Sequence, residues 1–229
     1  MNHTFTIIVP VWNEASTINE TISHIAALSY DGDVEIIVVD ASPHVETLHA
    51  VHGDRARKII SEKKGRSFQM NAGATHARGE ILLVRHADTE LPPGALQSIS
   101  SAMADNDIMA GSFDLGIQSR RPVFRAIEHA ASIRSRITRI PYGDQVIFIR
   151  REYFQKIGGF KEIPLMEDVE LMRRIKKAGH RIYIIPEKVR TSPRRWEEEG
   201  ILFCTLRNWI LISLYLLGVP PEKLVKFYR

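Results

Sequence analysis

The stretch GEILLVRHADTE, residues 79–90, decides the fold. It begins with an apolar run typical of a buried strand and ends in His86, Asp88 and Glu90. Ligands of open α/β sheets bind at the carboxyl ends of the strands, so these polar side chains predict a cleft there. In an extended backbone, residues two apart share one face, which would gather the three around a divalent cation and its diphosphate. A polar turn that closes the strand is the alternative explanation.

Strand and helix patterns alternate on the N-terminal side of this segment. Apolar runs at 5–10, 34–39 and 57–60 are typical of strands, and helical spacing is found at 14–28 and 67–77. Such alternation predicts a parallel sheet with right-handed crossovers. The near-continuous apolar strands fit a sheet that is buried on both faces.

The second half of the chain is less regular. Its patterns predict helices at 93–103, 167–177 and 197–217, strands at 108–117, 146–149 and 181–185, and a basic helical stretch at 121–139. The sequence shows neither an internal repeat nor a linker-like segment, so we expect one α/β domain.

Composition is that of an ordinary globular protein, with 229 residues, of which 44% are hydrophobic and 25% charged. Lysine and arginine total 31 against 27 aspartates and glutamates, which gives a net charge of +4. This small, scattered excess suits an anionic small molecule or an anionic membrane surface. It does not indicate nucleic acid as a partner.

The sequence predicts a cytoplasmic protein. A single cysteine, Cys204, excludes an intrachain disulfide framework, and the first residues show no secretory signal. The apolar run at 209–219 is shorter than the roughly 20 residues that span a bilayer. It predicts either a buried amphipathic helix or peripheral contact with the inner face of the membrane.

Polar residues also follow the first two predicted strands. The stretch PVWNE, residues 10–14, follows the first, and Asp40 ends the second. The carboxyl ends of parallel strands meet at one sheet edge, so we expect these residues near the 86–90 segment. The Asp40 carboxylate could accept hydrogen bonds from a ribose or a base, or could instead cap the next helix.

A basic turn opens the predicted helix at 67–77. Gly65 and Arg66 offer backbone N–H groups, the helix dipole and a guanidinium to an anion, which makes this a candidate phosphate or uracil site. Lys63 and Lys64 just before it are what a solvated basic surface segment would contain, without any binding role.

Two adjacent acids, Glu167 and Asp168, stand at a predicted helix start. Acidic residues are favoured in a first helical turn, so capping explains one of them without any function. Adjacent side chains diverge, and the other can therefore face a cleft. Asp168 is our candidate for a general base that takes a proton from an attacking hydroxyl. Glu167 would hold the acceptor molecule or the neighbouring backbone in place.

Two loops combine aromatic, polar and basic residues, namely YGDQ at 142–145 and SPRRW at 192–196. Arg195 would neutralise charge on a departing diphosphate, and Trp196 would stack on a sugar or base. A solvated surface is the alternative for both loops.

These motifs in this order resemble the family 2 glycosyltransferases of the GT-A fold. The matching segments are 10–14, Asp40, 65–74, Asp88, 158–160 and 167–168, which together cover roughly residues 5–175. Their compact form resembles a small bacterial subgroup labelled arsenosugar-type or radical-SAM-associated transferases.

The resemblance implies a three-layer sandwich around a mostly parallel mixed sheet. It implies one domain over 1–229, with a nucleotide-binding half at 1–90, an acceptor and catalytic half at 91–196, and a C-terminal helical segment at 197–229. The enzyme would move a sugar from a nucleotide-diphosphate donor, with uridine as the expected base, to the hydroxyl of a small-molecule or lipid acceptor. A homodimer is compatible with this reading.

The resemblance also assigns roles to residues. Asp168 would be the base of an inverting displacement with Glu167 beside it, and Asp88 with His86 would hold Mn²⁺ or Mg²⁺. The donor would contact Pro10, Trp12, Glu14, Asp40, Arg66, Asn71, Asp88, Arg195 and Trp196. The family usually has aspartate where this chain has His86, and because histidine suits borderline ions, this departure favours Mn²⁺.

Two other functions stay open on the sequence alone. A sugar nucleotidyltransferase would need a glycine-rich segment after the first strand, and the stretch 10–14 has no glycine. A non-catalytic protein that binds nucleotide sugars or docks on a membrane would keep the fold without turnover.

Overall fold

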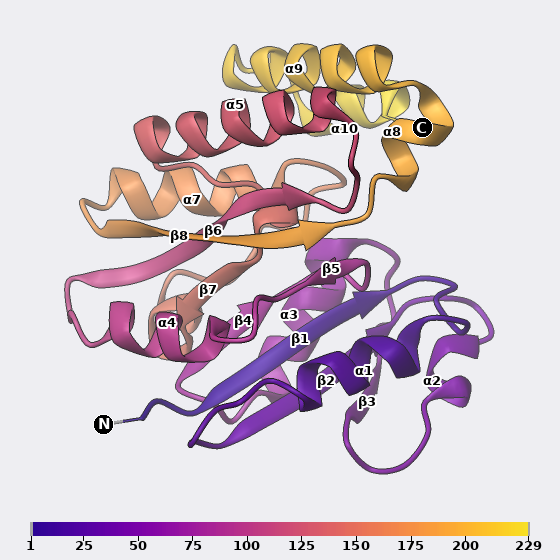
Figure 1. Ribbon diagram of the computed structural model, residues 1–229, viewed down its shortest axis with the longest axis vertical. Helices are drawn as coiled ribbons and strands as arrows, with labels where there is room; N and C mark the ends of the chain where they lie inside the picture. Colours follow the sequence, from indigo (N-terminus) through magenta and orange to yellow (C-terminus); the bar gives the residue numbers. More distant parts are fainter. Residues whose placement is uncertain (1, 229) are drawn as a thin grey trace.

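An eight-stranded sheet organises residues 2–228, the part of the chain that the computed structural model describes (Figure 1). Its strands are β1 Phe5–Val11, β2 Val34–Asp40, β3 Arg57–Ile60, β4 Ile81–Val84, β5 Thr89–Glu90, β6 Ile108–Ile117, β7 Ile147–Arg150 and β8 Arg181–Thr191. The helices are α1 Ile18–Ala26, α2 Glu46–Ala50, α3 Arg66–His76, α4 Ala95–Met103, α5 Pro122–Thr138, α6 Arg151–Lys156, α7 Glu167–Lys177, α8 Arg194–Glu199, α9 Ile201–Leu216 and α10 Pro221–Leu224. Two 3₁₀ turns, η1 Gly143–Gln145 and η2 Val225–Phe227, complete the chain.

The sheet is mixed and mostly parallel, as the sequence predicts. Strands follow the order β3-β2-β1-β4-β7-β6-β8-β5. The first four run parallel, β7 lies antiparallel between β4 and β6, β8 is parallel to β6, and β5 is antiparallel to β8. The carboxyl ends of β1, β2, β4, β6 and β8 therefore meet at one edge, and β7 begins there. This edge collects the side chains of the candidate site.

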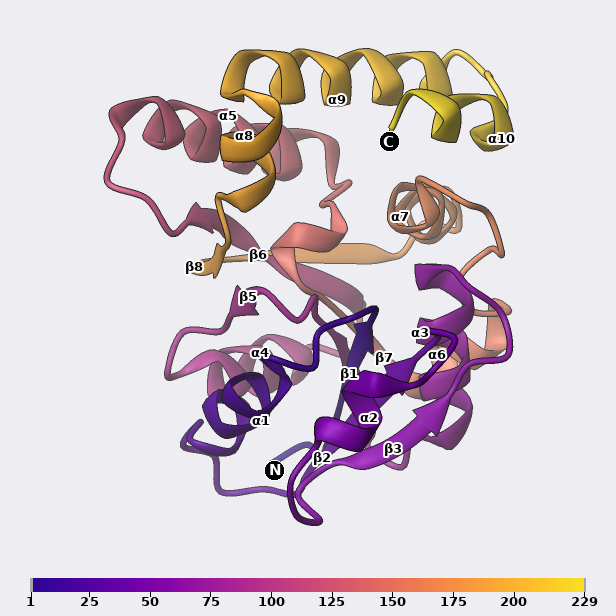
Figure 2. The same cartoon turned by 90° about the vertical axis from the view of Figure 1, so that its right-hand side faces the viewer.

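Both faces of the sheet are covered, which explains the near-continuous apolar strands. In β1, Ile7 packs in the core cluster that includes residues of α1 and α4, whereas Ile8 packs in the cluster that includes residues of α3 and α7. Figure 2 shows α1 and α4 on one side of the strands and α3 and α6 on the other. A Cβ at Gly73 of α3 would lie 2.6 Å from Ile8 Cγ2, so glycine permits the close approach of helix and strand.

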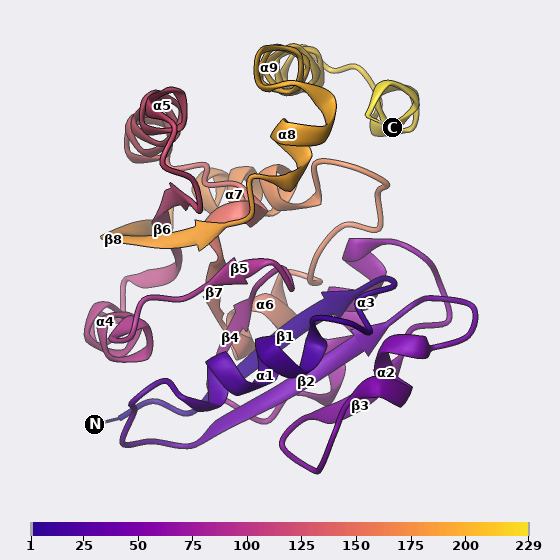
Figure 3. The ribbon, with the colours of Figure 1, turned by 45° about the vertical axis from the view of Figure 1, so that its right-hand side comes forward.

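The structure corrects the predicted C-terminal helix at 197–217. It is two helices, α8 and α9, which are separated by Gly200 at a φ of 91°. That conformation strains residues with a Cβ, so the glycine sets the break. Figure 3 shows α9, α10 and α5 as the outermost helices beyond β6 and β8.

Two further predictions need correction. The strand predicted at 181–185 continues to Thr191, because β8 pairs with β6 along nearly its whole length past an irregularity near Phe113. The expectation that His86, Asp88 and Glu90 lie on one extended strand is wrong. The backbone turns there, and the N–H of Thr89 donates to the carbonyl of His86 at 3.2 Å.

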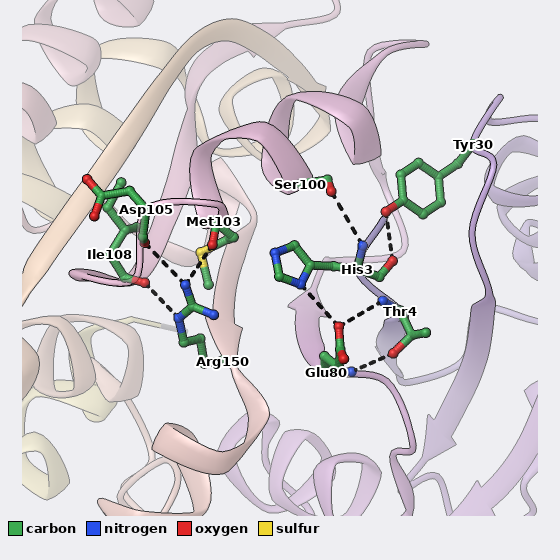
Figure 4. Close-up of polar contacts among 9 residues, drawn as sticks. All are labelled: His3, Thr4, Tyr30, Glu80, Ser100, Met103, Asp105, Ile108 and Arg150. Atoms are coloured by element: carbon green, nitrogen blue, oxygen red, sulfur yellow. Dashed lines mark hydrogen bonds and ion pairs between the residues drawn. The ribbon is translucent and has the colours of Figure 1, made fainter. Parts of the chain in front are cut away.

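The sheet edge opposite the candidate site is closed by polar contacts (Figure 4). The Glu80 carboxylate accepts hydrogen bonds from the backbone of Thr4 at 3.3 Å and lies 3.1 Å from His3 Nδ1. Arg150, at the end of β7, donates to the carbonyls of Met103 and Ile108 at 2.6 and 3.0 Å. These contacts fasten the amino ends of β1, β4 and β6, which leaves the opposite edge to bind ligands.

Candidate active site

A pocket of about 210 Å³ opens at the carboxyl edge of the sheet. The end of β4 contributes His86 and Asp88, the turn before β7 contributes residues 142–144, the start of α7 contributes Asp168, and α9 closes the pocket from outside. Segments far apart in sequence meet here because the sheet topology brings their ends together. The pocket combines basic, acidic and aromatic side chains and is about half open to solvent.

Asp168 is held in the pocket by two backbone N–H groups. Its Oδ2 accepts from Gly143 at 2.6 Å and its Oδ1 from Val169 at 2.7 Å. A Cβ at Gly143 would lie 3.2 Å from His86 Nε2 and 3.3 Å from Asp168 Oδ2. Gly143 therefore lies close to both the imidazole and the carboxylate. Each carboxylate oxygen keeps a further lone pair for a proton or a ligand.

Arg66 and Glu167 form an ion pair beneath this carboxylate. Arg66 Nε lies 3.0 Å from Glu167 Oε1, and the Glu167 side chain is only 4% exposed. Burial raises the pKa of Glu167, and the guanidinium of Arg66 opposes that rise. In turn, the Glu167 charge raises the pKa of Arg66 above its ordinary value. Glu167 is therefore placed to position Arg66, which itself lines the pocket.

His86 is an uncharged imidazole in the folded protein. Burial, with the charges of Arg66 and Arg85, lowers its pKa to about 3. Its Nε2 lies 3.5 Å from Arg66 Nη1 and faces the pocket beside Gly143. Neutral imidazole is the form of histidine that binds metals, and a metal ion at Nε2 would replace the hydrogen bond that this nitrogen accepts from Arg66.

The donors present suit a divalent cation that a diphosphate also holds. Within the described part of the chain, no three His, Cys, Asp or Glu side chains gather in an arrangement that could hold a metal ion by themselves. Asp88, exposed at the pocket rim, and His86 supply one carboxylate and one imidazole. Such ions are commonly bound by one or two protein groups together with substrate phosphates. Glu90 lies outside the pocket lining and is exposed.

Asp144 was singled out by the sequence only as part of a polar loop, and the structure places it in the pocket. Burial raises its pKa to about 6, and the Asp168 charge adds to that rise while Arg134 opposes it. Its Oδ1 is buried without a hydrogen-bond partner among residues 2–228. Arg134 stacks on the Tyr142 ring at 3.2 Å. A half-buried carboxylate with one buried oxygen that lacks a partner is suited to a ligand hydroxyl.

Replacing Asp144 with asparagine should stabilise the ligand-free protein near neutral pH. The pKa is about 6 in the folded state against an ordinary 3.8, so ionisation penalises folding increasingly as the pH rises from about 4 to 6. The full penalty is roughly 2–3 kcal/mol. We expect Asp144→Asn to raise the free energy of unfolding by about 1–3 kcal/mol near pH 8, with the gain shrinking toward pH 4.

Urea unfolding at several pH values measures this gain. Asp54→Asn is the matched control, because Asp54 is exposed. A gain that is independent of pH, or equal in the control, would show that the Asp144 charge carries no such penalty.

The predicted nucleoside residues Pro10, Trp12 and Asp40 lie outside the pocket lining. Asp40 and Val11 are paired in the sheet register, and Gln69 donates to the carbonyl of Val11 at 2.6 Å. Asp40 accepts the N–H of Ser42 at 2.8 Å, and its Oδ2 is buried without a partner within residues 2–228. Pro10 is buried, and Trp12 lies under the Lys64 ammonium at 3.8 Å.

Glu14 and Asn71 also lie outside the pocket lining. The Glu14 carboxylate accepts a hydrogen bond from Thr17 at 3.1 Å. Asn71 donates to the carbonyl of Phe160 at 2.8 Å and accepts its N–H at 2.9 Å. Both polar atoms of the Asn71 amide are therefore used to fix the 158–160 turn. A substrate contact for either residue stays a prediction.

Arg195 and Trp196 line the pocket. Arg195 stacks on the ring of Tyr228 at 3.8 Å and donates to its carbonyl at 2.9 Å. Trp196 packs edge-to-face on Phe124. Sequence patterns gave no signal for Tyr228 or for Asn208 of α9, which also line the pocket, because both are brought there only by the return of the C-terminal helices.

A family comparison identifies a match over more than half of the chain. The model of glycosyl transferase family 2 matches residues 6–161. The matched range begins in β1 and runs to the turn that Asn71 holds.

Two curated relatives are similar over most of this chain. The probable glycosyltransferase YdaM of Bacillus subtilis (strain 168) is 25% identical over 84% of this chain and 50% of its own length. An uncharacterized glycosyltransferase of Rickettsia felis is 27% identical over 96% of this chain and 39% of its own length. The chain thus spans half or less of each relative.

Two solved structures are also similar. The mannosyltransferase PcManGT of Pyrobaculum calidifontis, in complex with GDP-Man and Mn²⁺, has a TM-score of 0.63 at 25% identity and covers 83% of this chain and 57% of that one. The glucosyl-3-phosphoglycerate synthase of Mycobacterium tuberculosis, in complex with Mn²⁺, UDP and glucosyl-3-phosphoglycerate, has a TM-score of 0.66 at 18% identity and covers 95% and 81%. The second likeness concerns the fold alone.

Proposed function

Since this chain belongs to glycosyl transferase family 2 and has a fold of the GT-A type, we propose that it transfers a sugar from a nucleotide-diphosphate donor to an acceptor hydroxyl with inversion. The observation that carries this proposal is the pocket itself. One carboxylate, Asp168, is fixed by backbone N–H groups opposite His86 and Asp88 at the carboxyl edge of the sheet. This arrangement suits a displacement that needs a base on one side and charge neutralisation on the other.

In this proposal Asp168 takes the proton of the acceptor hydroxyl as its oxygen attacks the anomeric carbon. The bond between that carbon and the diphosphate oxygen breaks in the same step, and the nucleoside diphosphate leaves with the bonding electrons. The N–H groups of Gly143 and Val169 keep the carboxylate oriented, which limits the loss of entropy on reaching the transition state. Arg66 and Arg195 place positive charge in the same pocket.

A divalent cation held by Asp88 and His86 would neutralise the diphosphate as it departs. The neutral His86 imidazole favours Mn²⁺ over Mg²⁺, since Mg²⁺ prefers oxygen ligands. Both similar structures hold Mn²⁺ with a nucleotide, one GDP-Man and the other UDP. For this chain we propose a uridine nucleotide, and the buried Asp40 Oδ2, which has no partner within residues 2–228, is the acceptor we assign to the nucleoside.

Ligand-dependent stabilisation tests the donor and the cation together. A ligand that binds only the folded state raises the free energy of unfolding, by about 2.7 kcal/mol at a concentration 100 times Kd. We expect UDP and UDP-sugars to raise Tm with Mn²⁺, less with Mg²⁺, and least with chelator. GDP-mannose serves as the competing donor. No shift with any nucleotide and either cation would refute nucleotide-sugar binding.

The His86→Ala variant provides the matched control for the cation. It should lose most of the Mn²⁺-dependent part of the shift and keep the smaller shift seen with Mg²⁺.

Product analysis separates the proposed activity from nucleotidyl transfer, because a sugar transferase releases a nucleoside diphosphate whereas a nucleotidyltransferase releases or consumes pyrophosphate.

We also propose that the protein contacts a membrane peripherally through its C-terminal helical segment. Across residues 2–228, none of the helices combines the length and the apolar character needed to cross a bilayer. Yet α9 exposes several large apolar side chains, among them Leu202 and Trp209 at 73% and 62%, and Leu217 just after the helix is 82% exposed. Of the two alternatives that the sequence leaves open for the 209–219 run, these exposed apolar side chains support the peripheral contact.

A further inference from the structure

The outward half of α9 is mostly apolar, with Ser213 as its exposed polar residue. Its exposed large side chains are Leu202, Phe203, Leu206, Trp209, Ile210, Leu216 and, just after the helix, Leu217. The opposite side, with Cys204, Asn208 and Leu211, lines the pocket. An apolar helix face is normally packed against another part of the protein. Here the inner half contacts the active site and the outer half is open to whatever lies outside the molecule.

Helix α5 extends this surface. Val123, Ile133 and Ile137 are exposed, and their spacing of ten and four residues puts them on one side of the helix. Ile127 and Ala131, on the adjoining side, pack with Trp196 and Ile201 next to α9. The exposed stripe of α5 therefore adjoins the side that faces α9. Figures 1 to 3 place both helices, with α10, at one end of the long axis.

On α5 and α9, the two helices that form this surface, the exposed charged side chains are all positive. Glu128, the sole acid of α5, is buried, and α9 contains no acid. The basic residues Arg121, Arg125 and Arg136 are exposed on or just before α5, although Arg125 and Arg136 also pair with Glu128 and Asp114 at 2.8 and 2.6 Å. The exposed acids next to α9 are Glu197 and Glu198 of α8. Beyond α9, the segment 221–227 exposes Lys223 and Lys226, with Glu222 as its one acid, beside Phe227, which is 68% exposed.

We propose that this surface, the outward faces of α5 and α9 with Phe227, docks on an anionic phospholipid bilayer. An apolar face flanked by cations is the arrangement that inserts between lipid headgroups and meets their negative charge. A contact with a second protein chain would not need this basic rim. The inference rests on the proposed peripheral contact and specifies its residues and lipid charge. The bilayer surface would lie about one helix diameter, roughly 10 Å, from the pocket.

Vesicle flotation of the full chain tests the docking surface without any nucleotide sugar. We expect flotation with vesicles of phosphatidylglycerol and phosphatidylcholine, and at least about tenfold less with phosphatidylcholine alone or at high salt. The double variant Trp209→Ser, Leu217→Ser should lose about tenfold or more of the partitioning, because two large apolar side chains no longer insert. The variant Arg121→Gln, Lys226→Gln should lose binding only to the anionic vesicles.

Ile60→Ser is the matched control, because Ile60 is 62% exposed on the edge strand β3, away from the docking surface. Equal flotation of all variants, or none by the unmodified chain, would overturn the proposal. So would a stable dimer that the Trp209 and Leu217 changes dissociate. A nucleotide-induced Tm shift that persists in the double variant shows that lost docking and lost donor binding are separate failures.

Discussion

Replacing Asp168 with asparagine is expected to lower kcat by about 10²–10⁴-fold while the donor still binds. Asparagine keeps the shape of the side chain and removes the basic oxygen. The pocket keeps His86, Asp88 and Arg66, so nucleotide-dependent stabilisation should change little. Steady-state release of nucleoside diphosphate measures turnover, and the Tm shift with donor and Mn²⁺ measures binding.

The structure also predicts a stability cost for this variant. Asp168 accepts two backbone N–H groups, from Gly143 and Val169. An asparagine presents one oxygen and one NH₂ group, so one of these N–H groups faces another donor. The free energy of unfolding should fall by about 1–3 kcal/mol as a result. Unfolding must therefore be measured alongside activity. Glu170→Gln is the control on the same helix, since Glu170 pairs with Arg174 and lies outside the pocket lining.

A folded Asp168→Asn protein with undiminished kcat would remove Asp168 from the mechanism. A loss shared equally by Glu170→Gln would trace the effect to helix α7 as a whole. Loss of donor stabilisation in Asp168→Asn alone would instead assign the carboxylate to donor binding.

Replacing Arg66 with methionine is expected to destabilise the fold by about 2–3 kcal/mol near pH 8, or roughly 5–10 °C in Tm. The change leaves the buried Glu167 carboxylate without its cation. Because Arg66 is 38% exposed, the loss is smaller than for a fully buried pair. Donor stabilisation should fall as well, since Arg66 lines the pocket and contacts His86.

The pH dependence distinguishes this cause from lost packing. Burial already raises the pKa of Glu167, and removing Arg66 raises that pKa further. A carboxyl group with a raised folded-state pKa penalises folding as the pH rises above its ordinary value and is harmless below it. The deficit of Arg66→Met should therefore shrink toward about pH 4.

The double variant Arg66→Met, Glu167→Gln completes the test. It removes both charges, so it should recover most of the lost stability while the donor remains weakly bound. Glu167→Gln alone should cost less stability than Arg66→Met, because the remaining guanidinium reaches water. Additive losses in the double variant would show that the pair is not coupled.

Particular segments show how far the sequence reaches. Helix α7 begins and ends where the sequence predicts, at Glu167 and Lys177, because an acidic first turn and a basic last turn are local signals. The 197–217 prediction missed the break at Gly200, because a positive φ is a tertiary choice that composition permits without requiring it. The 86–90 segment turns rather than extends because the chain passes from β4, beside β1, to β5, which pairs with β8 at the other side of the sheet.

By itself, the sequence determined the α/β class, the strands of the parallel half and the set of polar strand ends from which a site is built. Those features depend on periodicity and on residues close together in the chain. Only the tertiary structure decided that Asp144 and Tyr228 reach the pocket, that Asn71 holds a turn, and that one side of α9 faces the site while the other faces outward. These outcomes depend on where distant helices return to the sheet, and packing between distant segments leaves no periodic pattern in the sequence.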